Sequence, residues 1–179
     1  MKNARSIYWG IIVIGLIIVS GGIYYLLDGF DPVKVYFFNG ATRTVIGKEY
    51  YIPNDHKIFR TKMDSATIDL ENETLKGKLT TVVYQDQWIN KDSIHCFIGA
   101  SQDSIKEALR IPPGYDCKKF STNRIYRIFI TQNQWTQPTP ETIEEIMAIK
   151  SMEEGDVFQP LTFELYHRDK SLHVEKWVK

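Results

Sequence analysis

The stretch LTFELYHRD, residues 161–169, places a glutamate between two large apolar side chains in a segment with the alternating pattern of a β-strand. An ionised carboxylate in such a place is costly unless it has a partner or a wet pocket. The stretch also has a counterpart earlier in the chain, because LTTVVY at residues 79–84 matches LTFELY at residues 161–166 in three of six positions. The strand that carries Glu164 is therefore predicted to be one of a pair.

A second pair of matching segments extends this repeat. SIHCFIG at residues 93–99 parallels SLHVEKW at residues 171–177 through its serine and histidine, in the same order along the chain. Each predicted hairpin is preceded by a helix candidate and, before that, by a strand. The order strand, helix, strand, strand thus occurs twice, which predicts an α+β fold of duplicated β-α-β-β units with pseudo-twofold symmetry.

The helix signals differ between the two halves. In the second half Thr139 can cap a helix that has Pro140 at its first position, and Gly155 can end it. In the first half a helix is predicted from an apolar stripe at helical spacing, formed by Phe59, Met63, Ala66 and Leu70. The upstream strands are indicated by VKVYFF, TVIGKEYYI and NRIYRIFIT.

The N-terminal part of the chain has a different character. Residues 7–27 contain no charge, and a helix of this length crosses roughly 30 Å of hydrocarbon. We predict a transmembrane helix there, and the chain divides into a tail, the span, a connector and one domain, at residues 1–6, 7–27, 28–34 and 35–179.

The charges around this run bear on its orientation. Lys2 and Arg5 precede it closely and favour an inside N-terminus, so we expect a single-pass membrane protein whose domain is extracytoplasmic, and periplasmic in a Gram-negative cell. The alternative is a secretory signal peptide cleaved near the small residues Ser20, Gly21 and Gly22.

Charge and metal-ligand patterns restrict the function. The chain has 22 basic and 22 acidic residues and no basic run, so nucleic acid is not expected as a partner. No cofactor is expected, and no metal, because His95 and His173 lie outside any cluster with ligand spacing. Cys96 and Cys117 form one disulfide if the domain is exported, or remain two buried thiols.

Strand parity assigns side chains to the two faces of the predicted sheet. With both helices packed on one side, the other side becomes a concave cleft. Leu161, Phe163 and Leu165 are expected to point to the helices, and Thr162, Glu164 and Tyr166 to the cleft. In the matching strand, Val82 is the expected counterpart of Glu164, so the acid is specific to one half.

Most of residues 35–178 resembles the GyrI-like family, the gyrase-inhibitory-protein and effector-binding domains of multidrug-sensing transcription activators, which are distant relatives of the haem-binding SOUL proteins. The resemblance lies in the order and spacing of GKEYYI, TVVYQDQ, FIGAS, IPPGYDCKKF before RIYRIFI, and TFELYHRD. The chain departs from the family at Gln87 and its neighbours, where an aromatic-acidic turn is altered. It also carries the apolar N-terminal run where activators carry a helix-turn-helix domain.

The resemblance implies a central cleft that binds bulky apolar or cationic molecules, with Glu164 in the family's Glu-hydrophobic-Tyr pattern. Aromatic side chains on the same face add dispersion and cation–π contacts to such a guest. The ligand-binding candidates are Glu164, Tyr84, Tyr126, Tyr166, Phe97 and Trp135.

Three functions remain open at this point. The first is a membrane-tethered, non-catalytic module that binds a small hydrophobic or cationic molecule. The second is a hydrolase of electrophilic compounds that uses Glu164 as general acid or base with Tyr126 or Tyr84. The third is an adaptor that binds a protein partner.

Overall fold

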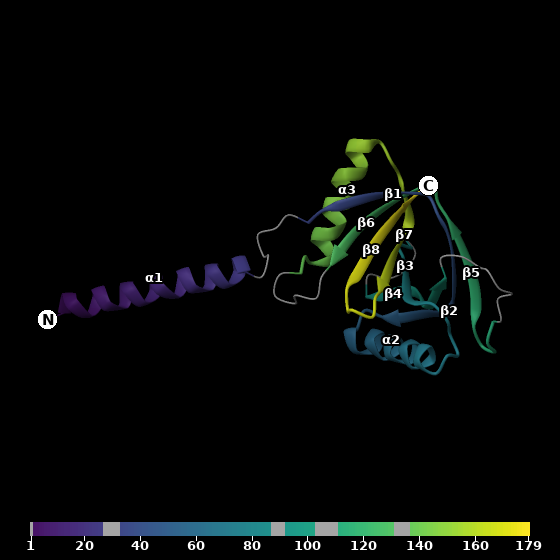
Figure 1. The fold of residues 1–179 in the computed structure, drawn as a ribbon, viewed down its shortest axis with the longest axis horizontal. Coiled ribbons are helices and arrows are strands. Elements are labelled where there is room, and N and C mark those ends of the chain that lie inside the picture. Colours follow the sequence, from purple (N-terminus) through teal and green to yellow (C-terminus); the bar gives the residue numbers. More distant parts are fainter. Residues whose placement is uncertain (1, 27–32, 87–91, 103–110, 131–136) are drawn as a thin grey trace.

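The structure is a computed structural model that describes residues 2–26, 33–86, 92–102, 111–130 and 137–179. Helix α1 (Lys2–Leu26) forms over most of the N-terminal apolar run, and Figure 1 shows it standing apart from the sheet. Among the described residues, no helix combines the length and the apolar character that a membrane crossing requires. The predicted transmembrane helix therefore has no support from the structure.

The duplicated unit predicted from the sequence is confirmed. Both copies have the order strand, helix, strand, strand. The first copy consists of β2 (Thr42–Pro53), α2 (His56–Glu71), β3 (Lys78–Tyr84) and β4 (Ser93–Gln102). The second consists of β6 (Arg124–Ile130), α3 (Pro140–Glu154), β7 (Phe158–Tyr166) and β8 (Leu172–Val178).

Both domain helices begin at a side-chain cap. Asp55 caps α2 by accepting a hydrogen bond from the backbone N–H of Lys57. Thr139 caps α3 in the same way and Pro140 follows it, as predicted. Gly155 ends α3 at φ 72°, a left-handed conformation that a residue without a Cβ adopts at little cost.

The eight strands form one antiparallel sheet in the order β1-β6-β8-β7-β3-β4-β2-β5. The edge strand β1 (Val35–Asn39) overlaps the predicted VKVYFF segment, residues 33–38, and extends one residue beyond it. The other edge strand, β5 (Asp116–Ser121), was not predicted, because DCKKFS is too polar to show a strand pattern. It forms by pairing with β2, where Cys117 lies opposite Ile46.

The sheet is strongly curved, so that one of its faces closes on itself. Arg43 of β2 contacts Glu175 of β8 at 2.6 Å, although three strands separate β2 from β8 in the sheet. Figure 1 shows the strands converging near the C-terminus. We call this enclosed side the inner face, and its packed core consists of Val45, Val82, Phe97, Ile125, Leu161, Phe163, Leu165 and Trp177.

The opposite side, which we call the helix face, carries α2 and α3. Met63 and Ala66 of α2 pack on β2, β3 and β4, whereas Ile143 and Met147 of α3 pack on β6 and β8. The helices thus cover different halves of the sheet. The central strand β7 lies next to β3 in one half and next to β8 in the other.

The predicted assignment of side chains to the two faces was wrong. Leu161, Phe163 and Leu165 belong to the inner core, while Tyr166 packs with the α2 residues on the helix face. Apolar side chains on a strand mark a buried face, and the curvature buries the inner face as fully as helices bury the other. Parity alone could not distinguish the two.

Val82, the predicted counterpart of Glu164 in the first half, was wrong by one residue. In the paired strands, Tyr84 lies opposite His95 and Leu165 lies opposite His173. If the two histidines are equivalent, then Val83, not Val82, corresponds to Glu164. A slip of one residue in a strand alignment moves every side chain to the other face.

Candidate functional site

Glu164 lies on the central strand β7, on the helix face. It sits opposite Thr81 of β3 on one side and Val174 of β8 on the other. Thr81 hydrogen-bonds the sulfur of Met63 in α2 at 3.1 Å, and Val174 packs with the α3 residues, so Glu164 lies between the two helices' contacts with the sheet. Its side chain is half-buried.

The carboxyl group of Glu164 has a phenol as its hydrogen-bond donor. The Tyr166 hydroxyl donates to Oε2 at 2.7 Å. Among the described residues, no lysine, arginine or histidine is within ion-pair distance of Glu164. The site therefore holds an acid without a cation.

Burial sets the protonation of this group. Desolvation raises the pKa of the Glu164 carboxyl above its usual 4.5, and the Tyr166 hydrogen bond opposes this only in part. Burial and the adjacent Glu164 charge also raise the pKa of the Tyr166 hydroxyl, which therefore stays protonated and acts as a donor. An ionised Glu164 is costly here unless a positive charge arrives.

Cys96 of β4 also faces this region. Burial first, and the charge of Glu164 second, raise the pKa of the Cys96 thiol to about 12. It is a neutral, unreactive thiol at physiological pH. Cys96 is buried and Cys117 is exposed, and both are unpaired, so no disulfide joins them.

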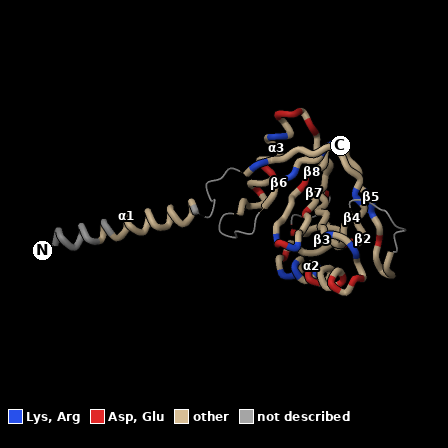
Figure 2. The backbone as a smooth tube through the Cα atoms, in the orientation of Figure 1, with Lys and Arg blue, Asp and Glu red and all other residues tan. Residues whose placement is uncertain are grey.

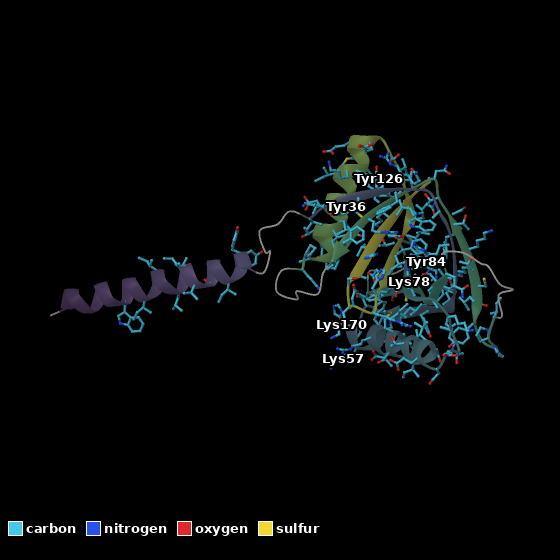
Figure 3. All side chains as sticks on the ribbon, viewed as in Figure 1. Tyr36, Lys57, Lys78, Tyr84, Tyr126 and Lys170 are labelled. Carbon is cyan, nitrogen blue, oxygen red and sulfur yellow. The ribbon has the colours of Figure 1, made fainter. Side chains whose placement is uncertain are left out.

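Of the predicted site residues, the structure brings Tyr166 to Glu164, whereas Tyr84 and Phe97 lie together on the inner face, beneath the ammonium group of Lys118. Phe97 is fully buried in the inner core, and Tyr84 stacks on His95 on the inner face, at a ring-centroid distance of 4.2 Å. Tyr126 is on the helix face but belongs to β6, where its hydroxyl donates to Asp156 at 2.5 Å. Figure 3 marks Tyr126 close to α3 and Tyr84 nearer to α2.

Trp135, the remaining candidate, lies outside the described residues. Tyr84 lies on the opposite face of the sheet and the Tyr126 hydroxyl donates to Asp156, so neither hydrogen-bonds Glu164 as the sequence suggested. Tyr166 is the tyrosine placed to do so.

An acidic group that the sequence did not reveal lies on the inner face. Glu175 of β8 is fully buried and accepts hydrogen bonds from Arg43 at 2.6 Å, Arg127 at 2.8 Å and the Trp177 indole at 2.9 Å. Although desolvation opposes ionisation, the hydrogen bonds and charges of the two arginines hold the pKa of Glu175 below its usual value. This acid is fully partnered, unlike Glu164.

A weak signal for this cluster was present in the sequence. Arg43, Arg127 and Glu175 each occur in a strand at the parity of apolar inner-face neighbours such as Val45 and Trp177. Charges of opposite sign at buried parity positions imply pairing. Their pairing across non-adjacent strands depends on the curvature, which the sequence does not show.

His95 lies in a second polar cluster on the inner face. Its Nε2 contacts Glu49 at 2.8 Å and its Nδ1 contacts Asp86, and the ring stacks between Tyr51 and Tyr84. Glu49 also contacts the ammonium group of Lys118 at 2.5 Å, so the charged groups of this cluster are paired with one another, which fits a structural role.

The described residues offer no place for a metal ion, since they contain no group of three suitable ligands. His167 and His173 contact each other at 2.9 Å. Burial, together with the positive charges of neighbours, lowers the pKa of His173 to about 4. Two ring nitrogens at hydrogen-bond distance do not complete a zinc site.

A depression of about 590 Å³ lies at the end where the strands converge. Its lining is mostly polar and comes from the turns between β1 and β2 and between β5 and β6, with Lys179. None of these residues contacts Glu164 or the inner-face acid, and we assign no chemistry to it.

No protein-family model matches the chain, and no curated protein matches it. Among solved structures, EcmrR in complex with DNA is similar to this chain with a TM-score of 0.53 and 10% identity, covering 90% of this chain and 65% of EcmrR. SAV2435 bound to tetraphenylphosphonium has a TM-score of 0.47 and 10% identity, covering 83% of this chain and 94% of SAV2435. A hydrolase from Listeria innocua has a TM-score of 0.45 and 9% identity, covering 87% of this chain and 98% of the hydrolase.

These likenesses concern the fold. The similarity to EcmrR shows a shared architecture, and an eight-stranded antiparallel sheet with helices on one face is compatible with the GyrI-like fold that the sequence resembles. Because that EcmrR structure is a DNA complex, the comparisons lend no support to the expectation that nucleic acid is not a partner.

Proposed function

We propose that this domain binds a bulky, apolar organic cation on the helix face, with Glu164 as its counter-charge. The observation that carries the proposal is a half-buried carboxyl group hydrogen-bonded by Tyr166 and without a basic partner among the described residues. A protein that needed this acid only for stability would pair it, as it pairs Glu175 with two arginines.

The surroundings of Glu164 favour an organic cation over a small hydrated ion. Small and apolar side chains lie on the same face around Glu164, from Thr162, Val83 and Cys96. Tyr166 adds an aromatic ring. A lipophilic cation loses little hydration when it is buried, and it gains both the charge of Glu164 and contact with an aromatic side chain.

A hydrolytic activity is the second candidate. A carboxyl group with a raised pKa beside a protonated tyrosine has the chemistry of a general acid or base. Both proposed functions, binding and hydrolysis, depend on Glu164. Turnover of an electrophilic substrate by wild type, and its loss in Glu164→Gln, would indicate catalysis rather than binding alone.

Membrane attachment is a separate proposal. It is supported by the uncharged sequence of residues 7–27. Expression of the full chain with and without residues 2–26, followed by alkaline carbonate extraction of membranes, tests it. Release of the full chain by carbonate contradicts integral attachment.

The ligand proposal is tested with tetraphenylphosphonium, the molecule bound in the SAV2435 structure, whose charge is shielded by four phenyl rings. Thermal shift and titration calorimetry on the full chain should show binding of this cation but not of neutral triphenylphosphine oxide. Glu164→Gln should abolish that preference. Glu153→Gln removes an exposed acid of α3 and should leave binding unchanged. Equal binding by wild type and Glu164→Gln contradicts the proposal.

A further inference from the structure

Lys176 is the cation nearest in the sheet to Glu164, yet it does not pair with it. Lys176 lies on β8 opposite Thr162 of β7, and Glu164 is two residues further along the same face of β7. The lysine side chain is almost fully buried. The structure thus places a buried ammonium group and a half-buried carboxyl group on neighbouring strands.

The ammonium group of Lys176 is held elsewhere, by α3. Its Nζ lies 3.5 Å from Oε1 of Glu144, and the same oxygen accepts a hydrogen bond from the Gln85 side-chain amide at 2.8 Å. Figure 2 shows the acidic residues along α3. Glu144 therefore joins α3 to β8 and to the end of β3, and among the described residues its partners are Lys176 and Gln85.

The alternative partner is within reach of Lys176. Residues at diagonal positions of paired antiparallel strands are roughly 7–8 Å apart at their Cα atoms, close enough for long side chains to meet. The four-carbon stem of lysine is flexible and carries a compact charge. A contact with the Glu164 carboxylate requires a rotation of the Lys176 stem away from Glu144.

We propose that Glu144 is a positioning residue, which holds Lys176 away from Glu164 and so keeps the carboxylate available to a ligand cation. Loss of the Glu144 contact transfers Lys176 to Glu164, and the chain's own cation then occupies the site. This inference rests on the proposed function, because it concerns access to the same carboxylate.

The energetics support such a transfer. A buried ammonium group without a counter-charge is costly, and burial already lowers the pKa of Lys176 despite the opposing charge of Glu144. When Glu144 is replaced, Glu164 becomes the acid of β7 and β8 nearest to Lys176 on the helix face, since Glu175 points to the inner face. Two other titratable groups face Glu164, namely Tyr166 and Cys96. Both are neutral, so neither competes for the lysine.

The test compares four proteins with tetraphenylphosphonium: wild type, Glu144→Gln, Lys176→Met and the double variant. Glu144→Gln should weaken binding about tenfold or more, since a neighbouring opposite charge stabilises ionised Glu164 by an amount of this order. Lys176→Met keeps the apolar stem and should bind at least as well as wild type. The double variant should recover the affinity, because no lysine remains to occupy the site.

The double variant separates this mechanism from a direct attraction between Glu144 and the ligand. If Glu144 attracts the cation itself, Lys176→Met does not restore affinity to Glu144→Gln, and that result overturns the inference. Glu145→Gln, a neighbouring exposed acid on α3, serves as the matched control and should leave affinity unchanged.

A ligand-free measurement distinguishes failure of this inference from failure of the proposed function. The Glu164 carboxyl carbon is titrated by NMR in wild type and Glu144→Gln. Transfer of Lys176 should lower the pKa of Glu164 by about one pH unit or more in the variant. An unchanged pKa overturns the inference even if the cation binds to wild type, and a lowered pKa supports it even if no ligand binds.

Discussion

Val82 of β3 and Phe163 of β7 lie opposite each other at the centre of the sheet, and the pairs on either side of them are related by a local twofold axis. Thr81 faces Glu164 on one side, and Val83 faces Thr162 on the other. The axis exchanges the two threonines and makes Val83 the counterpart of Glu164. The duplicated fold thus places a single carboxyl group beside its own symmetry axis, between the two helices.

The first prediction concerns the cost of that carboxyl group. Its folded-state pKa is raised, so its favourable contribution to folding is present below the unfolded value near 4.5 and is lost as the pH rises through the folded value. Glu164→Gln should therefore raise the melting temperature at about pH 7.5 by roughly 2–4 °C, equivalent to about 1 kcal/mol. Calorimetric melting of the full chain measures this.

The gain should shrink as the pH is lowered towards 4.5, where Glu164 of the wild type becomes protonated. Glu153→Gln, which changes an exposed acid, should not show this pattern. A destabilised Glu164→Gln at neutral pH would mean that the carboxylate has a stabilising partner in solution.

The second prediction concerns the buried acid of the inner face. Glu175→Gln leaves Arg43 and Arg127 without a counter-charge, and breaking a buried ionic group in this way costs about 3–5 kcal/mol. Urea denaturation at neutral pH should show the loss as a lower midpoint with an unchanged slope.

The pH dependence of Glu175→Gln should be opposite to that of Glu164→Gln. The pKa of Glu175 is lowered, so its stabilisation is present above about 4.5 and is lost as the pH falls through the folded value. The difference between wild type and variant should therefore decrease only in strong acid. An unchanged urea midpoint of Glu175→Gln at pH 7 would contradict the ion pairs of Glu175 with Arg43 and Arg127.

Much of the fold could be predicted from local signals. Thr139, Pro140 and Gly155 specify the ends of α3, and the duplicated Ser and His segments indicated two equivalent hairpins, because caps and strand patterns depend on neighbouring residues. The pairing of Glu164 with Tyr166 is also local, two residues along one strand. The face on which both lie was predicted wrongly, because it depends on the curvature of the whole sheet.

The missed features share this dependence on distant contacts. Arg43 reaches Glu175 across non-adjacent strands, and no spacing in the sequence encodes that approach. β5 forms because β2 offers it an edge, not because DCKKFS favours a strand. Lys176 and Glu144 likewise meet only when α3 is packed on β8.

A third prediction concerns a close approach between β2 and β4. Gly47 and Gly99 lie opposite each other, and a Cβ on Gly99 would lie 2.0 Å from the carbonyl oxygen of Ile46. Because backbone atoms cannot move aside without shifting the strands, Gly99→Ala should destabilise the domain by about 1–3 kcal/mol. Gly21→Ala in α1, where a Cβ meets nothing within 4 Å, is the control. Unaltered urea stability of Gly99→Ala would show that the strands separate freely there.

The last prediction is the pH dependence of cation binding. A ligand cation must meet an ionised Glu164, and burial raises the pKa at which this carboxyl group ionises. Below the folded pKa the cation has to displace a proton, so its affinity should fall about tenfold for each pH unit, whereas above the pKa it should be constant. By the same linkage, a bound cation lowers the pKa of Glu164.

Calorimetric titration with tetraphenylphosphonium in buffers of different ionisation enthalpy, from about pH 5 to about pH 8, measures both the affinity and the released protons. Residual binding by Glu164→Gln should be independent of pH over this range. If wild type binds the cation with a flat profile and no proton release, the charge that the ligand meets is not that of Glu164.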